Sequence, residues 1–351
     1  MKRNLLYLSF VALSFAGCKD EGTNPVEVDD NITTIGFTSC SLQKIEPKDC
    51  FKTLSNLNLD GMIFAGDNIY GDYLALSHGS QVFIQEQYQL LSKEPEFRAL
   101  RNSVKNIYAT WDDHDYGKND GVVDNPAKVY ARKLFCDFWH EPQNSIRRTR
   151  EDGIYQSYIQ GEGDKKVQII CLDLRWNQSP HVGNAVSGYP VQTDPAKTML
   201  GETQWAWLKE ELKKPAAVRI MVSSLQFCAP YNGGEAWAVY PNEQQRMFDL
   251  INETQANGVF FISGDVHYAE LCRLKPSNTY NLYDLTSSGV THVGTAPVVN
   301  ENRIEEPFSK FNFGLINIDW NKSPVEISLE VHGSKGEMAI QKVVSLDELK
   351  Y

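Results

Sequence analysis

The chain is organised around ten residues, Trp111-Asp112-Asp113-His114-Asp115-Tyr116-Gly117-Lys118-Asn119-Asp120, which follow the apolar run 107–109. Four aspartates, a histidine and an asparagine fall within this segment. Carboxylates this close repel one another unless a cation lies among them, and oxygen ligands suit hard or borderline metal ions. An acidic surface loop is the alternative, and matching segments elsewhere in the chain decide between the two.

Around this segment, apolar runs alternate with amphipathic stretches. The runs predict strands at 33–38, 61–65, 104–109, 153–159, 166–172, 217–222, 258–262 and 280–285, and three more in the tail at 313–319, 325–331 and 338–344. The amphipathic stretches predict helices at 47–57, 127–139, 203–213 and 242–257, and at 81–102 with a break at Pro95. The charged sequence of residues 141–153 predicts a surface turn. Residues 177–200 have no clear periodicity, which predicts a long loop. This alternation predicts an α/β fold in which helices cover a sheet.

Many of the predicted strands end in a polar residue. These residues are Cys40, Asp67, Asp113, Asp173, Ser223 and Asp265. In sheets of this kind, ligands gather beyond the carboxyl ends of the strands. We therefore expect side chains from distant parts of the sequence to converge on one site.

Composition narrows the class of protein. The chain has 351 residues, 42% of them hydrophobic, and shows no internal repeat or second-domain boundary. Its formal net charge of -11 argues against general nucleic-acid binding, which needs a basic surface. A small phosphate ester remains compatible with this charge, because a bound metal can reverse the local field.

The amino terminus resembles a bacterial lipoprotein signal. Met1-Lys2-Arg3 is basic, an apolar run follows, and Phe15-Ala16-Gly17 precedes Cys18. We expect a signal peptide at 1–17, lipidation of Cys18, a polar tether at 18–31 and one domain at 32–351. An ordinary secretory signal is the alternative. No later apolar run has the roughly twenty residues that span a bilayer. These features predict a protein lipid-anchored in the bacterial cell envelope, facing the periplasm or the cell surface.

Two short motifs after predicted strands offer further ligands. Asp67 and Tyr70 have the spacing G-D-x-x-Y, in which the carboxylate can bridge two cations and the phenolate suits Fe(III). Asp265 and His267, spaced D-x-H, would share one side of an extended segment. Cys40 is a candidate thiolate ligand.

The other cysteines and histidines named below do not lie in motifs with further candidate ligands. Cys136, Cys171, Cys228 and Cys272 lie in apolar contexts and are predicted to be core residues. The histidines predicted to be surface or packing residues are His78, His140, His181 and His332.

The chain resembles the alkaline phosphatase D (PhoD-like) branch of the calcineurin-like metallophosphoesterases, roughly over residues 33–292. The matching stretches are 37–40 (FTSC), 66–70 (GDNIY), 111–117 (WDDHDYG), 172–175 (LDLR), 223–226 (SSLQ) and 263–270 (SGDVHYAE). The resemblance implies a four-layer αββα sandwich with a metal centre of Fe(III) and one or two calcium ions, although other divalent metals would also fit.

The resemblance also implies roles for individual residues. The metal ligands would be Cys40, Asp67, Tyr70, Asp113, Asp265 and His267, with Asp67 bridging. His114 matches a histidine that contacts the phosphoryl group. Arg175 would help to neutralise the ester, or would only pair with Asp173. Weaker candidates for contacts around the ligands are Asp112, Asp115, Asn119, Asp173 and His292.

The implied function is hydrolysis of a small phosphate mono- or diester by a metal-activated hydroxide, in a protein that we expect to be a monomer. Members of the family often carry an amino-terminal β-domain and a carboxy-terminal helix over the site, whereas this tail predicts strands; a more open site is therefore expected. The alternatives are a phospholipase-type phosphodiesterase acting on lipid or teichoic-type substrates, and a non-enzymatic lipoprotein that binds metal or glycan. A glycosidase using Asp112, Asp113 or Asp115 is disfavoured, because adjacent aspartates at a strand end would project oppositely.

Overall fold

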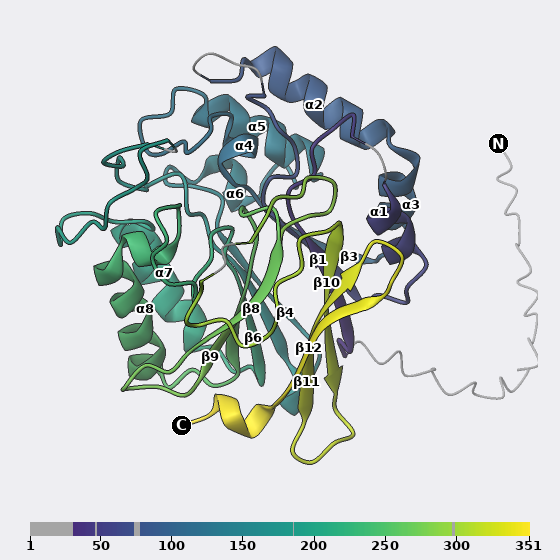
Figure 1. Cartoon of the computed structure of the whole chain (residues 1–351), viewed down its shortest axis with the longest axis vertical. Coiled ribbons are helices and arrows are strands. Elements are labelled where there is room, and N and C mark those ends of the chain that lie inside the picture. Colours follow the sequence, from purple (N-terminus) through teal and green to yellow (C-terminus); the bar gives the residue numbers. More distant parts are fainter. Residues whose placement is uncertain (1–30, 46–47, 74–77, 185, 297–298) are drawn as a thin grey trace, which may run out of the picture.

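The computed structural model describes residues 31–45, 48–73, 78–184, 186–296 and 299–351, and these form two six-stranded sheets (Figure 1). The first sheet has the spatial order β12 (Met338–Ser345), β11 (Glu326–Gly333), β10 (Asn312–Asp319), β1 (Thr34–Thr38), β2 (Gly61–Ala65) and β3 (Asn106–Thr110). The second has the order β4 (Gln156–Gln160), β5 (Val167–Cys171), β6 (Val218–Val222), β7 (Val259–Ser263), β9 (Leu282–Ser287) and β8 (Ala269–Leu274).

Helices cover the outer face of each sheet, which completes the predicted four layers. α1 (Asp49–Ser55), α2 (Gln81–Lys93), α3 (Pro95–Ser103) and α5 (Lys128–Phe138) share a core with the first sheet. α7 (Glu202–Leu212) and α8 (Pro241–Thr254) pack on the second. The short helices are α4 (Asp113–Tyr116) and α6 (Ile146–Thr149), and 3-10 turns occupy Gly163–Lys165, Trp237–Val239 and Leu346–Leu349.

The core lies mainly between the sheets. Phe37 and Ile63 from the first sheet belong to the same buried cluster as Ile169 and Ile220 from the second. Every residue of β2, β5, β6 and β7 is buried, as expected for strands covered on both faces.

The direction of the central strands determines where a site can form. β1, β2 and β3 run parallel in one sheet, and β5, β6, β7 and β9 run parallel in the other. Between successive parallel strands, helices return the chain to the start of the next strand, except that the antiparallel β8 does so before β9. The carboxyl ends therefore share one edge of each sheet. The residues after these strands can therefore meet.

Most predicted elements are confirmed, including the three tail strands and the break at Pro95, which begins α3. The described part of 177–200 contains no helix or strand apart from an isolated bridge between Asn184 and Gly188. The strand β8 is missing from the sequence-based prediction.

The prediction of a surface turn at 141–153 was wrong in part. This segment contains α6, and the side chain of Arg147 is only 1% exposed. Its guanidinium donates to the carbonyl oxygens of Ala109 (2.6 Å) and Ile154 (2.7 Å) and pairs with Glu141 (2.6 Å). A charged sequence pattern conceals this role, because the cation is buried only when these partners surround it.

The expected signal peptide, the lipidation site Cys18 and all of the tether but Asn31 lie outside the described residues. Within the described ranges, no helix has both the length and the apolar character needed to cross a bilayer.

The buried position of Arg147 generates a stability prediction. Arg147→Met would leave the Glu141 carboxylate and two carbonyls without their partner, and should lower the free energy of unfolding by about 3 kcal/mol in urea titrations. Lys133→Ala is the matched control, because Lys133 is 66% exposed and pairs with Asp137; it should change stability by less than about 0.5 kcal/mol. Equal effects of the two variants would contradict this role.

Candidate metal centre

Side chains that follow β1, β2, β3 and β7 converge into two main groups that share Asp67, and Asp67 also forms a smaller group with Asp113 and His114. Cys40, Asp67 and His267 place one ligand atom each within 4.8 Å of one another. Asp67 also forms such a group with Asp112, Asp113 and Asp265. The predicted convergence of distant strand ends is therefore present in the fold.

The phenol of Tyr70 lies beside the thiol and the imidazole of the first group. Cys40 Sγ lies 3.4 Å from Asp67 Oδ2, and the Tyr70 hydroxyl lies 2.9 Å from His267 Nε2. The three-residue spacing between Asp67 and Tyr70 returns the phenol to the site, where it is 2% exposed.

Burial and the negative charge of neighbouring groups raise the free energy of the ionised carboxylates in the second group. Burial, followed by the charges of Cys40 and Asp113, raises the pKa of Asp67 well above its usual range. Burial and the charge of Asp112 do the same for the pKa of Asp265. Asp67 Oδ1 and Asp112 Oδ2 are buried without a hydrogen-bond partner. Unpartnered anionic oxygens at this spacing fit a bound cation, which would offset the repulsion.

The backbone is strained at the same residues. Cys40, Asp67, Asp265 and His267 have φ angles of 60°, 50°, 67° and 62°. Non-glycine residues seldom adopt this left-handed conformation, which costs about 1–3 kcal/mol each and occurs mainly at functional sites. The expectation that Asp265 and His267 lie on an extended segment was wrong, since left-handed turns direct their side chains into adjacent groups.

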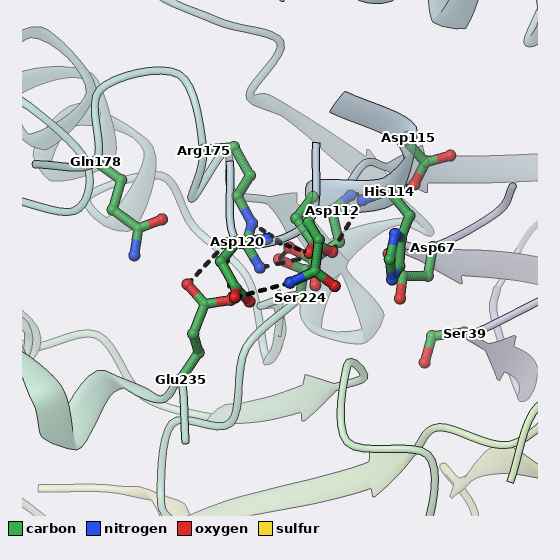
Figure 2. Close-up of polar contacts among 12 residues, drawn as sticks. Ser39, Asp67, Asp112, His114, Asp115, Asp120, Arg175, Gln178, Ser224 and Glu235 are labelled. Carbon is green, nitrogen blue, oxygen red and sulfur yellow. Dashed lines mark hydrogen bonds and ion pairs between the residues drawn. The ribbon is translucent and has the colours of Figure 1, made fainter. Parts of the chain in front are cut away.

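Arg175 lies between two carboxylates beside the second group (Figure 2). Its Nε lies 2.5 Å from Asp112 Oδ1 and its Nη1 lies 2.9 Å from Glu235 Oε1. Its buried Nη2 has no hydrogen-bond partner but lies 3.9 Å from Asp113 Oδ1. The guanidinium therefore does not pair with Asp173. The Asp173 carboxylate instead accepts backbone N–H groups, including that of Arg175 at 2.9 Å.

Glu235, which pairs with Arg175, is the main residue of the site that the sequence analysis missed. Its carboxylate also lies 2.6 Å from His181 Nε2, a contact that the sequence analysis did not predict. Glu235, Asp113 and Asp120 form a further group of close carboxylates. Glu235 follows the sequence Asn232-Gly233-Gly234, in which nothing but a possible turn signals a functional residue.

His114 stands at the boundary of the two groups. Its Nδ1 lies 2.6 Å from Asp72 Oδ1, and its ring centroid lies 4.1 Å from that of Tyr70. Burial opposes its charge, but Asp113 and the hydrogen bond with Asp72 outweigh it and raise the pKa of His114 to about 9. Asp72 is a second contact that the sequence analysis did not single out.

The weaker candidates have different positions. Asp115 accepts the backbone N–H groups of Asp112 and Asn68 at 3.1 Å each, and so shapes the loop beneath the site. The side chain of Asn119 donates to Asp120 at 2.8 Å. His292 Nδ1 lies 3.0 Å from the Tyr70 hydroxyl. Asp112 and Asp113 contribute to one group rather than projecting oppositely, because β3 has ended and Asp113 begins α4.

Comparison with known proteins now identifies the family, because the model of the PhoD-like phosphatases matches residues 35–311. The chain belongs to the PhoD-like phosphatase family. A solved structure of PhoD is similar, with a TM-score of 0.69 and 17% identity over 91% of this chain and 71% of that one. GAP50, the anchor in the inner membrane complex of Plasmodium, has a TM-score of 0.55 and 12% identity over 90% of this chain and 89% of that one. No curated protein sequence matches.

Membership of the PhoD-like phosphatases has direct consequences. The chain is a phosphoric ester hydrolase of a metal-dependent family, and the close groups around Asp67 are candidate metal-binding sites. The structural likeness to PhoD agrees with the two-sheet sandwich.

The contact between Glu235 and Arg175 generates a prediction about turnover. Glu235→Gln removes one of the two buried charges that hold the guanidinium, and should lower phosphate release about ten-fold, the usual scale for residues that orient a metal site. Glu253→Gln is the matched control, since Glu253 is 58% exposed and pairs with Lys209. Unchanged kcat and KM in Glu235→Gln would contradict the role of Glu235.

The repulsion around Asp67 generates a second prediction. In chelator-treated protein, Asp67→Asn should raise the midpoint of thermal unfolding, because it removes a buried charge. The folded-state pKa of Asp67 is raised, so the charge lowers stability only as the pH rises above about 4, the ordinary carboxyl value. The stabilisation should therefore be small at pH 4 and grow toward pH 7. A lower midpoint of thermal unfolding for Asp67→Asn than for the parent at pH 7 would contradict the proposed repulsion.

Proposed function

We propose that the chain hydrolyses phosphate esters at a centre of Fe(III) and calcium held by Cys40, Asp67, Tyr70, Asp113, Asp265 and His267. The observation that carries the proposal is the position of Asp67, whose carboxylate belongs both to the group with Cys40 and His267 and to the group with Asp113 and Asp265.

The chemistry of the two groups supports two kinds of metal. Thiolate, phenolate and imidazole from Cys40, Tyr70 and His267 favour iron, whereas the carboxylates of Asp112, Asp113 and Asp265 favour a hard cation such as calcium over zinc. Cations bound there would offset charge on the phosphoryl oxygens and activate a water molecule for in-line attack.

Arg175 and His114 act on the ester in this proposal. Arg175 is oriented by Asp112 and Glu235, and its Nη2, which lies 3.9 Å from Asp113 Oδ1 without a hydrogen bond, is the nitrogen that binds a phosphoryl oxygen. Because Nδ1 of His114 is held by Asp72, Nε2 is the nitrogen that contacts the phosphoryl group or protonates the leaving oxygen. A residue that orients the imidazole in this way fixes which nitrogen faces the substrate.

The proposal also covers the domain organisation, the location and the substrate of the protein. Residues 32–351 form the catalytic domain of a monomer, which the tether at 18–31 joins to a lipid-modified Cys18 in the cell envelope. The substrate is a small phosphate mono- or diester. The acidic composition supports a small ligand over a nucleic acid.

Asp67→Asn tests the shared ligand. This variant should release no phosphate from p-nitrophenyl phosphate and no p-nitrophenol from its diester, while retaining the parent's circular dichroism. Chelation should abolish the activity of the parent protein, and added metal should restore it. Asp319→Asn, at an exposed residue that ends β10, is the control and should keep parental turnover. Substantial hydrolysis by Asp67→Asn would refute the shared role.

A further inference from the structure

The loop 288–294 lies against the first ligand group, and backbone contacts hold it there. The N–H groups of Val290 and Thr291 donate to the carbonyl oxygens of Ser39 (3.3 Å) and Cys40 (3.4 Å). The Gly294 N–H donates to the carbonyl of His267 at 2.5 Å. His292 lies between these anchors, so the fold fixes the position of its ring.

The ring of His292 contacts two of the proposed ligands. Its Nδ1 lies 3.0 Å from the Tyr70 hydroxyl, and its ring centroid lies 3.8 Å from that of His267. Its ring nitrogens fall in none of the close ligand groups found among the described residues. The geometry therefore places His292 beside the ligands rather than among them.

Counting the hydrogen-bond donors and acceptors around the Tyr70 hydroxyl shows which group donates to it. The hydroxyl oxygen lies within hydrogen-bond distance of His267 Nε2 and of His292 Nδ1 and also interacts with the Cys40 thiol, but it has only one proton to donate. One imidazole must therefore be the donor. His267 belongs to the group with Cys40 and Asp67, and if Nε2, the nitrogen that faces Tyr70, is its ligand atom, it must keep a lone pair to bind a cation. Tyr70 then donates its proton to His267 or to Cys40, and in either case His292 Nδ1–H donates to Tyr70.

From this geometry, we propose that His292 is a positioning residue that donates a hydrogen bond from Nδ1 to the phenolic oxygen of Tyr70. The inference rests on the proposed function, in which Tyr70 and His267 are metal ligands. As ligands they would no longer hydrogen-bond to each other, and His292 would remain the donor to the phenolate. Such a donor fixes the orientation of the ligand and draws electron density from its oxygen.

The tautomer can be tested without metal. In chelator-treated protein, the ring nitrogen-15 shifts of His292 should show a protonated Nδ1 and an unprotonated Nε2, and His267 should show an unprotonated Nε2. A His292 protonated only at Nε2 would overturn the proposal, because its Nδ1 could then only accept.

Iron-loaded variants test the consequence for the ligand. His292→Phe keeps an aromatic ring over His267 but removes the donor, so the tyrosinate-to-iron absorption band should move to longer wavelength. The concentration of competing chelator that removes half of the iron should fall about ten-fold. His292→Asn replaces Nδ1–H with an amide N–H and should return both values toward those of the parent.

Tyr70→Phe separates failure of this inference from failure of the proposed function. If the band is lost in Tyr70→Phe but unchanged in His292→Phe, then Tyr70 is a ligand and the role of His292 is refuted. If the band persists in Tyr70→Phe, or the iron-loaded parent has no such band, the assignment of Tyr70 as a ligand fails, and the inference fails with it.

Discussion

Asp67, Asp112, Asp113 and Asp265 bring carboxylate oxygens within 4.8 Å of one another in a largely buried site, and the repulsion among them is the constraint on which the site depends. Left-handed backbone at Asp67 and Asp265 adds a conformational cost. Neither cost favours folding, so the two-sheet core must supply the stability that keeps these groups together. A site of this kind trades stability for function, and a bound cation would recover part of the loss.

The topology allows this concentration of charge. Two parallel blocks of strands, β1–β3 and β5–β7 with β9, direct their carboxyl ends to one region, where the side chains that follow β1, β2, β3 and β7 meet. Arg175 contributes positive charge beside the acidic group, and it is itself held by Asp112 and Glu235. Asp67 belongs both to the first group, with Cys40 and His267, and to the second group of carboxylates. This is the position that a bridging ligand needs.

The strand pattern predicted helices on a sheet and the convergence of the strand ends, because both follow from short buried strands that end in polar residues. The four layers, with two sheets, were implied only by the resemblance to the family. The sequence also identified Cys40, Asp67, Tyr70 and the aspartates, whose clustering is visible along the chain. It could not predict Glu235 or His181, since their roles arise from contacts 54 residues or more apart that no local pattern encodes. Arg147 was missed for a related reason: its charge suggests solvent, and only the carbonyls of Ala109 and Ile154 explain its burial.

The central claim is that these anionic side chains meet in order to hold cations. Anomalous X-ray scattering from crystals of protein purified without chelator tests it most directly. The account predicts a transition-metal peak bonded to Cys40, Asp67, Tyr70 and His267, and a second cation beside Asp113 and Asp265. Fully active crystals with no metal at either position would contradict it.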